Sequence, residues 1–492
     1  MNPITRRTFI KSAAFTAAAF SLPRSPWARV PGANDEIRIA IVGFNGQGKS
    51  HIGSIADMRK KGEKVRITAL CVVDEAVLGK VAQEFKDKNE PVQTYTDIRK
   101  LLENPEIDAV SIATPNHWHA LMTIWACQAG KDVYVEKPVC HNVWEGRQMI
   151  RAARAHKRIV QAGTQSRSSS GIREAVAWVN EGHLGKILIS RGLCYKPRQS
   201  IGKVSAPQRP PASVDYDLWC GPAPMTPLMR NRLHYDWHWV WPTGNGDLGN
   251  QGIHQMDIAR WFLGVDTLSP RVFSVGGRLG YSDDGETPNT QFIFHDYARA
   301  PLSFEVRGLP SRKDFQLDGK QWGENMDSYL GARIGVIVEC ENGRVLVPNY
   351  TGAVAIDKEG KELKRFQGAE NHHGNFFKAM RTRKAADLNA DIHEGFVSSA
   401  LCHTGNISYR LGKQSNPAEI RERVKADRDA TATFDRMAAH LEANGVDCNS
   451  EAVILGAFLK MDVKKEKFIR NKAADRLLTR DYRKPFAVPT KV

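Results

Sequence analysis

A lysine stands where a predicted buried strand ends, in the segment Val133-Tyr134-Val135-Glu136-Lys137-Pro138. Burying an unpaired ammonium group is costly, so packing alone does not explain an acid and a lysine at this point. In open α/β sheets, ligands bind at the carboxyl ends of the strands, which is where Lys137 would lie. An exposed lysine in a strand-to-helix loop is the alternative, and the rest of the sequence has to decide between the two.

A glycine-rich turn follows the first predicted strand, Ile37–Val42, and a helix is expected to begin near Lys49. Strand, glycine turn and helix are the context of a dinucleotide site, where the backbone approaches a pyrophosphate and the helix N-terminus supplies N–H donors. The spacing here is G-x-x-G-x-G, a variant of the usual order. The residues expected to contact the cofactor are Gly43, Asn45, Gly46, Gln47 and Gly48.

An acid ends the second predicted strand, Arg66–Val73. Asp74 can accept hydrogen bonds from both ribose hydroxyls of adenosine and would repel a 2′-phosphate, which favours NAD over NADP. A turn acid or a helix N-cap is the alternative. A third apolar strand, Ala109–Ala113, is followed by a polar loop that should face the ligand. That loop is Thr114, Pro115, Asn116 and His117.

Strands and helices alternate up to about residue 165, which predicts a doubly wound parallel sheet. A proline-rich loop at 196–227 then leads to an aromatic segment that contains Trp237 and His238. Aromatic faces with a few hydrogen-bonding groups suit a sugar ring, although a tryptophan-rich core segment is the alternative. A predicted helix, Ile253–Leu263, carries His254, and β-prone runs between 271 and 347 predict a largely antiparallel sheet.

Length and composition argue against several other classes of protein. The chain has 492 residues, 41% of them apolar and 25% charged, which predicts a soluble protein of two domains. Its formal net charge is +16, but acids are interleaved with the basic residues, so we expect no nucleic-acid partner. No apolar run is long enough to span a membrane. The eight cysteines lack C-x-x-C spacing, so we expect mostly free, buried thiols and no metal site.

The first 33 residues have the pattern of an export signal. Thr5-Arg6-Arg7-Thr8-Phe9-Ile10-Lys11 contains twin arginines, and an alanine-rich apolar stretch follows. This pattern predicts recognition by the twin-arginine export machinery and a periplasmic or otherwise exported protein. The twin-arginine route carries folded proteins, so a cytoplasmic cofactor would be taken up before export.

Together these segments resemble the Gfo/Idh/MocA family of NAD(P)-dependent oxidoreductases. The resemblance also includes Gly249–Gly264 with His254, Gly395–Leu411, and Tyr482-Arg483-Lys484-Pro485-Phe486. It implies a Rossmann domain at 34–165 and a C-terminal α/β domain at 166–414, with an open, mostly antiparallel sheet that binds substrate and forms a dimer or tetramer. Residues 415–492 are expected to be a helical extension that packs on both domains.

The resemblance implies oxidation or reduction of a hydroxyl or keto carbon in a sugar, polyol or glycoside, with a tightly held, recycled NAD. Lys137 would hold the substrate oxygen and stabilise its charge, and His254 would act as the base. The family often has an acid four residues before this histidine, where this chain has Asn250, which cannot take a proton. Asp247 and Asp257 are the nearest acids that could serve instead. Glu136, with Lys137, is expected beside the cofactor, and Trp237, His238, Asn250 and His254 beside the substrate.

Two further functions remain open from the sequence. The first is an NAD-dependent glycoside hydrolase or lyase that forms a keto-sugar only transiently. The second is a sugar-binding protein without catalysis, which the presence of both Lys137 and His254 argues against.

Overall fold

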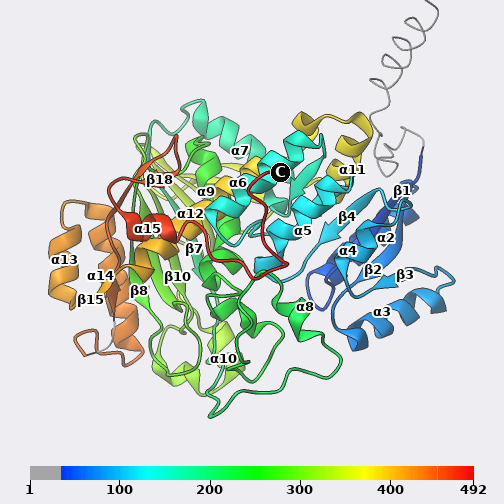
Figure 1. Ribbon diagram of the computed structural model, residues 1–492. Helices are drawn as coiled ribbons and strands as arrows, with labels where there is room; N and C mark the ends of the chain where they lie inside the picture. The colour runs from blue at the N-terminus through cyan, green and yellow to red at the C-terminus, as the bar shows by residue number, and fades with distance from the viewer. Residues whose placement is uncertain (1–34, 451–452) are drawn as a thin grey trace, which may run out of the picture.

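The predicted doubly wound sheet forms within the first third of the chain (Figure 1). The computed structural model describes residues 35–450 and 453–492, so the predicted signal at 1–33 lies outside the described residues. Six parallel strands run in the order β3-β2-β1-β4-β5-β6. They are β1 (Ile37–Val42), β2 (Val65–Cys71), β3 (Gln93–Tyr95), β4 (Ala109–Ile112), β5 (Asp132–Val135) and β6 (Val160–Ala162). The order reverses between β1 and β4, which opens a crevice at the strands' carboxyl ends.

Strand β1 is buried on both faces because helices cover both sides of this sheet. Ile37, Ile39 and Ile41 enter one apolar cluster, while Ala40 and Val42 enter another. A continuous apolar run of this kind is typical of a central parallel strand. The helices are α2 (Gly48–Lys60), α3 (Glu75–Asp87), α4 (Ile98–Leu102), α5 (Asn116–Gln128) and α6 (Val143–Ala155).

The rest of the chain contains a twelve-stranded sheet, most of whose strand pairs are antiparallel, as predicted. Its main path is β14-β13-β12-β11-β7-β10-β9-β8-β16-β15, and β7 with β10 is a parallel pair. The strands on this path up to residue 367 are β7 (Ile187–Tyr195), β8 (Arg271–Gly277), β9 (Thr290–His295), β10 (Leu302–Arg307), β11 (Ile334–Cys340), β12 (Gly343–Val347), β13 (Gly352–Asp357) and β14 (Glu362–Gln367).

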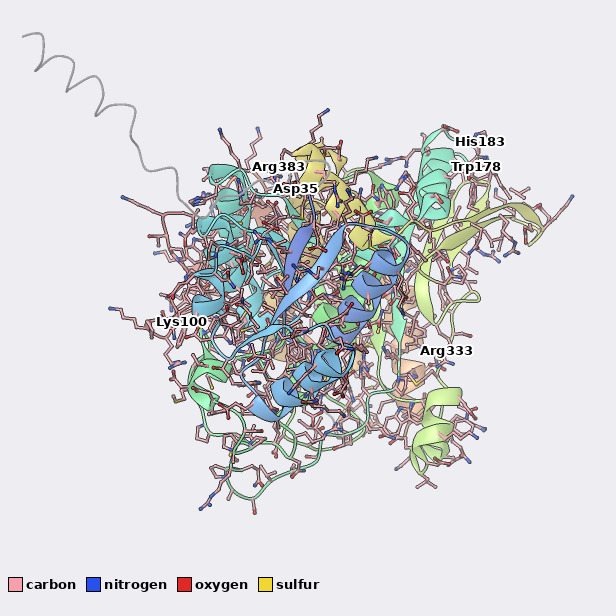
Figure 2. The ribbon with its side chains drawn as sticks, turned by 90° about the vertical axis from the view of Figure 1, so that its right-hand side faces the viewer. Asp35, Lys100, Trp178, His183, Arg333 and Arg383 are labelled. Atoms are coloured by element: carbon pink, nitrogen blue, oxygen red, sulfur yellow. The ribbon has the colours of Figure 1, made fainter. Side chains whose placement is uncertain are left out.

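Helices cover both faces of this sheet as well. Side chains alternate along β8, so Val272 enters the apolar cluster that includes α9 (Ile253–Leu263) and α12 (Ile392–Arg410), whereas Phe273 faces α13 (Pro417–Val424) and α14 (Arg428–Ala443). The remaining helices of four or more residues are α7 (Ser170–Asn180), α8 (Tyr216–Cys220), α10 (Gly319–Glu324), α11 (His372–Thr382), α15 (Lys472–Arg476), and short turns at Gln165–Ser168, Asp236–Trp239, Leu248–Gly252 and Lys313–Gln316. Trp178 of α7 stacks on His183 at the edge of the molecule (Figure 2).

The predicted helical extension at 415–492 contains the helices α13, α14 and α15, but three short strands stand between the last two. The chain continues through the short strands β16 (Ile454–Leu455), β17 (Leu459–Asp462) and β18 (Lys467–Phe468), after β15 (Lys413–Gln414) has begun this edge. Strands β16 and β17 pair with β8, so they form through a distant partner rather than through local propensity. The last residues cross to the first sheet, where Phe486 packs edge-on against Trp118 of α5.

Within the described part of the chain, no helix is long and apolar enough to cross a membrane. The same residues contain no group of three or more histidine, cysteine or acidic side chains placed to hold a metal ion. Seven of the eight cysteines, all except Cys448, are free and buried, as predicted.

Candidate functional site

A cavity of about 690 Å³ opens at the carboxyl ends of β1, β2, β4 and β5 and extends to the second sheet's domain. It runs from the glycine turn to the loop after β7 and the start of α9. The predicted site residues that line it are Gly43, Asn45, Gly46, Gln47, Asp74, Thr114, Pro115, Asn116, Glu136, Lys137, Trp237, His238, Asn250 and His254. The fold therefore brings nearly all of them together, from segments up to two hundred residues apart.

The glycine turn leaves room for a dinucleotide's phosphates. Gly43 has a φ of +79°, and a Cβ there would lie 2.9 Å from the Ala113 carbonyl oxygen. A Cβ at Gly48 would lie 2.0 Å from the Gly43 oxygen, so this glycine permits helix–turn packing and does not line the cavity. A Cβ on Gly46, which does line it, would meet only open space. No side chain caps the N-terminus of α2, so no side-chain charge offsets the positive end of the helix dipole at this turn.

Asp74 caps a helix and also lines the cavity. Its Oδ1 atom caps α3 by accepting from the amides of Ala76 and Val77, and the residue also lines the cavity. Its Oδ2 atom lies 3.0 Å from Nε2 of His234, a residue of the aromatic segment. A second acid, Asp97, lines the same end of the cavity. This end therefore carries two carboxylates.

Glu136 is buried and held by a hydrogen-bond network rather than exposed to solvent. Its Oε1 atom lies 3.0 Å from Nε2 of His51 and accepts a 3.0 Å bond from Gln165, and His51 also contacts Ser111. Burial alone would raise the pKa of Glu136, but the hydrogen bond and charge of His51, together with Lys137, lower it to about 2. Glu136 is therefore a fixed negative charge beside Lys137.

The ammonium group of Lys137 is partly buried and donates a 2.7 Å hydrogen bond to the backbone carbonyl of Asn250. Burial lowers the pKa of this lysine, and the negative charge of Glu136 partly offsets the effect. The carbonyl holding Lys137 belongs to the π-helical turn Leu248–Gly252, which leads directly into α9. Such turns are frequent at functional sites because they displace backbone groups from regular helical positions.

Neither of the two alternative acids reaches the cavity. Asp247 is buried and forms a bidentate ion pair with Arg198, at 2.6 and 2.9 Å. Asp257 is paired in the same way with Arg167 and also accepts a hydrogen bond from Ser398. Both carboxylates hold α9 and its preceding turn in place, so Asn250 has no acidic substitute among them.

His254 is a neutral imidazole in this environment. Burial lowers its pKa to about 3, and the positive charge of Lys137 adds to the effect. Its Nδ1 atom has no hydrogen-bond partner among the described residues, and its ring meets that of Tyr350 edge-on at 5.1 Å. Because His254 lines the cavity as a neutral imidazole, it can accept a proton from a bound molecule.

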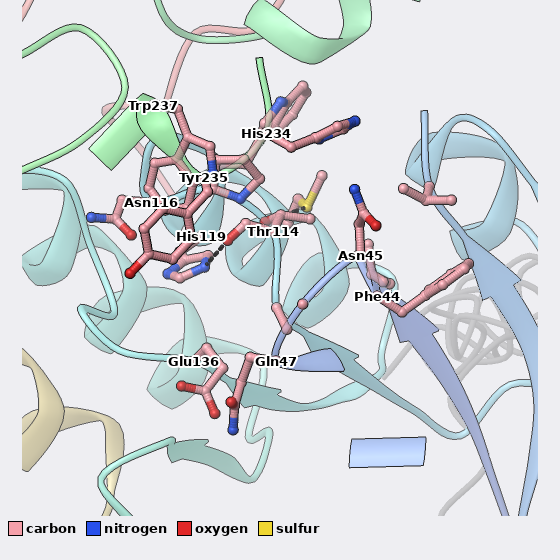
Figure 3. A pocket seen from close by; sticks show the side chains of 18 of the residues that line it. Phe44, Asn45, Gln47, Thr114, Asn116, His119, Glu136, His234, Tyr235 and Trp237 are labelled. Atoms are coloured by element: carbon pink, nitrogen blue, oxygen red, sulfur yellow. Dashed lines mark hydrogen bonds between the residues drawn. The ribbon is translucent and has the colours of Figure 1, made fainter. Parts of the chain in front are cut away.

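Aromatic side chains form the opposite wall. Trp237 stacks on His238 with ring centroids 3.6 Å apart, and burial lowers the pKa of His238 to about 3. Tyr235 adopts a φ of +68°, which is uncommon for a non-glycine residue and clusters at binding sites. Figure 3 shows Tyr235 and Trp237 close to His119, with Glu136 and Gln47 together in another part of the cavity.

One predicted site residue lies elsewhere. His117 turns away from the cavity and bonds the Trp219 carbonyl oxygen through Nε2, at 2.9 Å, and burial lowers its pKa to about 3. It begins α5, so its neighbours Asn116 and Trp118 face the cavity while it packs behind them. Sequence reasoning assigned no role to several other residues that line the cavity: Gln165, Lys196, Trp219, His234, Tyr235, Gln251 and Tyr350.

This geometry defines a two-domain NAD-binding oxidoreductase, with a Rossmann sheet and a second α/β domain that closes its crevice. The family model described as "Oxidoreductase family, NAD-binding Rossmann fold" matches residues 37–164. The companion model, "Oxidoreductase family, C-terminal alpha/beta domain", matches residues 172–294. The chain belongs to the Gfo/Idh/MocA family of oxidoreductases.

Individual relatives match only part of the chain. A glycosyl hydrolase family 109 protein of Shewanella baltica is 31% identical over 176 residues, which covers 31% of this chain and 38% of that protein. The 2,7-anhydro-N-acetylneuraminate hydratase of Mediterraneibacter gnavus is 26% identical over 263 residues, covering 52% of this chain and 60% of that protein. The chain thus spans between about two-fifths and three-fifths of the length of these relatives.

Solved structures share the fold. Levoglucosan dehydrogenase, in complex with NADH and levoglucosan, superimposes with a TM-score of 0.54 at 17% identity, covering 75% of this chain and 95% of that one. The WlbA dehydrogenase of Bordetella pertussis, in complex with NADH and UDP-GlcNAcA, gives a TM-score of 0.52 at 18% identity, covering 74% and 94%. At these identities the likeness describes the fold alone.

Proposed function

We propose that this protein transfers hydride between NAD and a hydroxyl-bearing or keto carbon of a sugar, polyol or glycoside. The observation that carries the proposal is that Lys137 and His254 line the same cavity as the glycine turn. A bound NAD would supply the hydride acceptor in its nicotinamide ring. The similarity in sequence to the 2,7-anhydro-N-acetylneuraminate hydratase supports a carbohydrate substrate.

The residues of this chain would handle the proton and the charge. His254 is neutral at ordinary pH and would accept the hydroxyl proton as the carbon loses hydride. Lys137, fixed by the Asn250 carbonyl, would donate a hydrogen bond to the oxygen as negative charge develops on it. The Asn250 side chain, which lines the cavity, would orient the substrate without taking a proton.

We infer a preference for NAD over NADP. Asp74 and Asp97 line the end of the cavity beside β2 and α4, where the adenosine ribose would lie. Two carboxylates there would repel a 2′-phosphate. Calorimetric titration should give a dissociation constant for NAD at least about tenfold below that for NADP, and equal constants would contradict the preference.

We further propose an exported protein that carries its cofactor with it. The twin-arginine pattern at Arg6 and Arg7 supports export, and the cavity, enclosed by both domains, supports retention of the cofactor. Fractionation of cells that express the full chain should place it outside the cytoplasm, and an Arg6→Lys, Arg7→Lys double variant should remain inside. A homo-oligomer remains a prediction that sedimentation would test.

Cleavage of a glycoside through a transient keto-sugar is the second candidate. It is favoured by the similarity to glycosyl hydrolase family 109 proteins and by Asn250 in place of the usual acid. Net formation of NADH with an intact product indicates simple oxidation, whereas release of the aglycone without net NADH indicates redox-neutral cleavage.

The test of the proposal is spectroscopic. The folded protein should release stoichiometric NAD(H) on denaturation, and before denaturation its nicotinamide absorbance should respond to a panel of sugars and 3-keto-glycosides. A protein that lacks cofactor, binds NAD only weakly and shows no spectral response to any sugar would contradict the proposal.

A further inference from the structure

We propose that the substrate end of the cavity recognises a carboxylate-bearing sugar, which Lys196 and Tyr350 hold. This inference rests on the proposed function, because it names the substrate class of the same cavity. It depends on three residues to which the sequence assigned no role: Lys196 after β7, Gln251 before α9, and Tyr350 between β12 and β13.

The hydrogen bonds among these residues leave two donor groups available to a ligand in the cavity. Nζ of Lys196 donates to Oε1 of Gln251 at 3.2 Å, and Nε2 of Gln251 donates to the Tyr350 hydroxyl oxygen at 2.6 Å. Since the Tyr350 oxygen accepts this bond, its own hydrogen is free to be donated. The ammonium group of Lys196 likewise keeps hydrogens beyond the one that Gln251 accepts. An ammonium and a hydroxyl donor on one wall suit a carboxylate's two oxygens.

The charges around this wall are not balanced within the protein. Among residues 35–450 and 453–492, Lys196 forms no ion pair, and Arg198 beside it is already paired with buried Asp247. Of the three carboxylates that line the cavity in this part of the chain, Asp74 and Asp97 lie at the adenosine end, and Glu136 is held by His51. The positive charge of Lys137 and Lys196 together therefore exceeds the negative charge near the substrate. Oxidised nicotinamide would add a further positive charge.

The carboxylate-binding wall adjoins the proposed reacting groups. The Tyr350 ring meets the His254 ring at 5.1 Å, and the charge of Lys196 lowers the pKa values of both Lys137 and His254. A sugar whose hydroxyl carbon lies at His254 can thus place a carboxylate of the same ring, or of the adjoining substituent, against Lys196. A uronic acid and other carboxylated sugars meet this requirement, whereas a neutral hexose leaves the ammonium group without a counter-charge.

The test compares matched pairs of acidic and neutral sugars. Binding of D-glucuronate against D-glucose, D-galacturonate against D-galactose, and their methyl glycosides is measured by calorimetry on the protein with bound cofactor, at low and high salt. At least one acid should bind about tenfold or more tightly than its neutral partner, and this preference should shrink at high salt.

Variants assign the effect to the proposed residues. Lys196→Met should remove the preference by weakening the acid alone, Lys196→Arg should largely keep it, and Tyr350→Phe should reduce it severalfold. Lys320→Met, at an exposed lysine on α10, is the matched control and should behave as wild type. Circular dichroism and retained cofactor would show that each variant is folded.

The inference is overturned if no acid binds more tightly than its neutral partner, or if Lys196→Met weakens both alike. Hydride transfer with neutral sugars alone would leave the proposed function standing and remove only this inference. Absence of NAD binding would instead contradict the proposed function.

Discussion

At the residue scale, the partly buried ammonium group of Lys137 is compensated in two ways. The Asn250 carbonyl accepts its hydrogen bond, and Glu136 supplies the opposing charge. A lysine that only stabilised the fold would not need to line a cavity beside a neutral, unpartnered histidine. This arrangement fits a residue that acts on a bound oxygen.

Lys137→Met tests this role. The variant should retain its cofactor, because the glycine turn and Asp74 are unchanged, while the rate of nicotinamide reduction by sugar should fall by about 10² to 10³. Single-turnover absorbance gives the rate, and Lys320→Met again serves as the control. A Lys137→Met variant with unchanged turnover would exclude the mechanism proposed for both candidate functions.

Asn250→Asp tests the consequence of the missing acid. In the wild type, His254 has a pKa of about 3, so its protonation should not limit the reduction rate between about pH 5 and about pH 8. A carboxylate four residues before it would stabilise the imidazolium and raise that pKa. The acid limb of the pH–rate profile should therefore shift to higher pH, by about one to two pH units, in the variant. A profile that does not change would argue that the side chain at 250 does not face His254.

The main site residues could be predicted from the sequence because they lie in short, ordered motifs. The glycine turn, Asp74, Lys137 and His254 all line the cavity that the motifs implied. His117 was assigned wrongly because the motif gives no helical phase, and at the start of α5 only neighbouring positions face the cavity. Lys196 and Tyr350 could not be found, because they come from loops whose positions depend on distant strand pairing.

At the element scale, the loop between β7 and α9 links the two domains. Val214 forms an isolated antiparallel bridge with Asp74, and the amide of Glu75 donates to the Ser213 carbonyl oxygen at 2.8 Å. His234, farther along the same loop, contacts Asp74 at 3.0 Å. The loop therefore closes over the adenosine end of the cavity while its aromatic segment lines the substrate end.

His234→Ala should loosen this closure. Release of bound NAD should become about fivefold faster, the effect of roughly 1 kcal/mol from a partly exposed pair. Dilution into excess labelled NAD measures the exchange rate, and His183→Ala, at the exposed histidine stacked on Trp178, is the matched control. An exchange rate equal to that of the wild type would show that the pair does not restrain the cofactor.

Elements with a strong local pattern were predicted well, and those formed by distant pairing were not. The predicted helix at 253–263 has the bounds of α9, and Gly264 in the left-handed region ends it locally. Strands β16 and β17 are only two and four residues long and exist because β8 offers an edge. Nothing in 444–492 alone distinguishes such strands from loop or helix.

At the scale of the whole molecule, buried neutral histidines are an unusual feature of the interior. Burial, as the largest cause, lowers the pKa of each of them. The values are about 3 for His117, His238, His254, His295 and His373, and about 4 for His372 and His403. Each would take up a proton on unfolding at a pH between its folded pKa and its unfolded value of about 6.5.

These histidines predict a loss of stability in mild acid. Because the unfolded state binds more protons below about pH 6.5, the free energy of unfolding should fall steadily as the pH drops from about 6.5 towards about 4. Urea denaturation over this range measures the slope. His295→Leu, a change in the second sheet remote from the cavity lining, should reduce the number of protons taken up by about one. A free energy of unfolding that does not change over this range would contradict these pKa values.

The most direct test of the proposed function is to follow the hydrogen itself. Protein with bound NAD is mixed with a sugar that gives a spectral response and carries deuterium on its ring carbons. The reaction is quenched at alkaline pH, where NADH is stable, within one turnover, and the cofactor is analysed by mass spectrometry. We predict one deuterium on the released NADH from the wild type and far less from Lys137→Met in the same time. NADH without deuterium, or a turned-over sugar with no label ever reaching the cofactor, would contradict hydride transfer at this site.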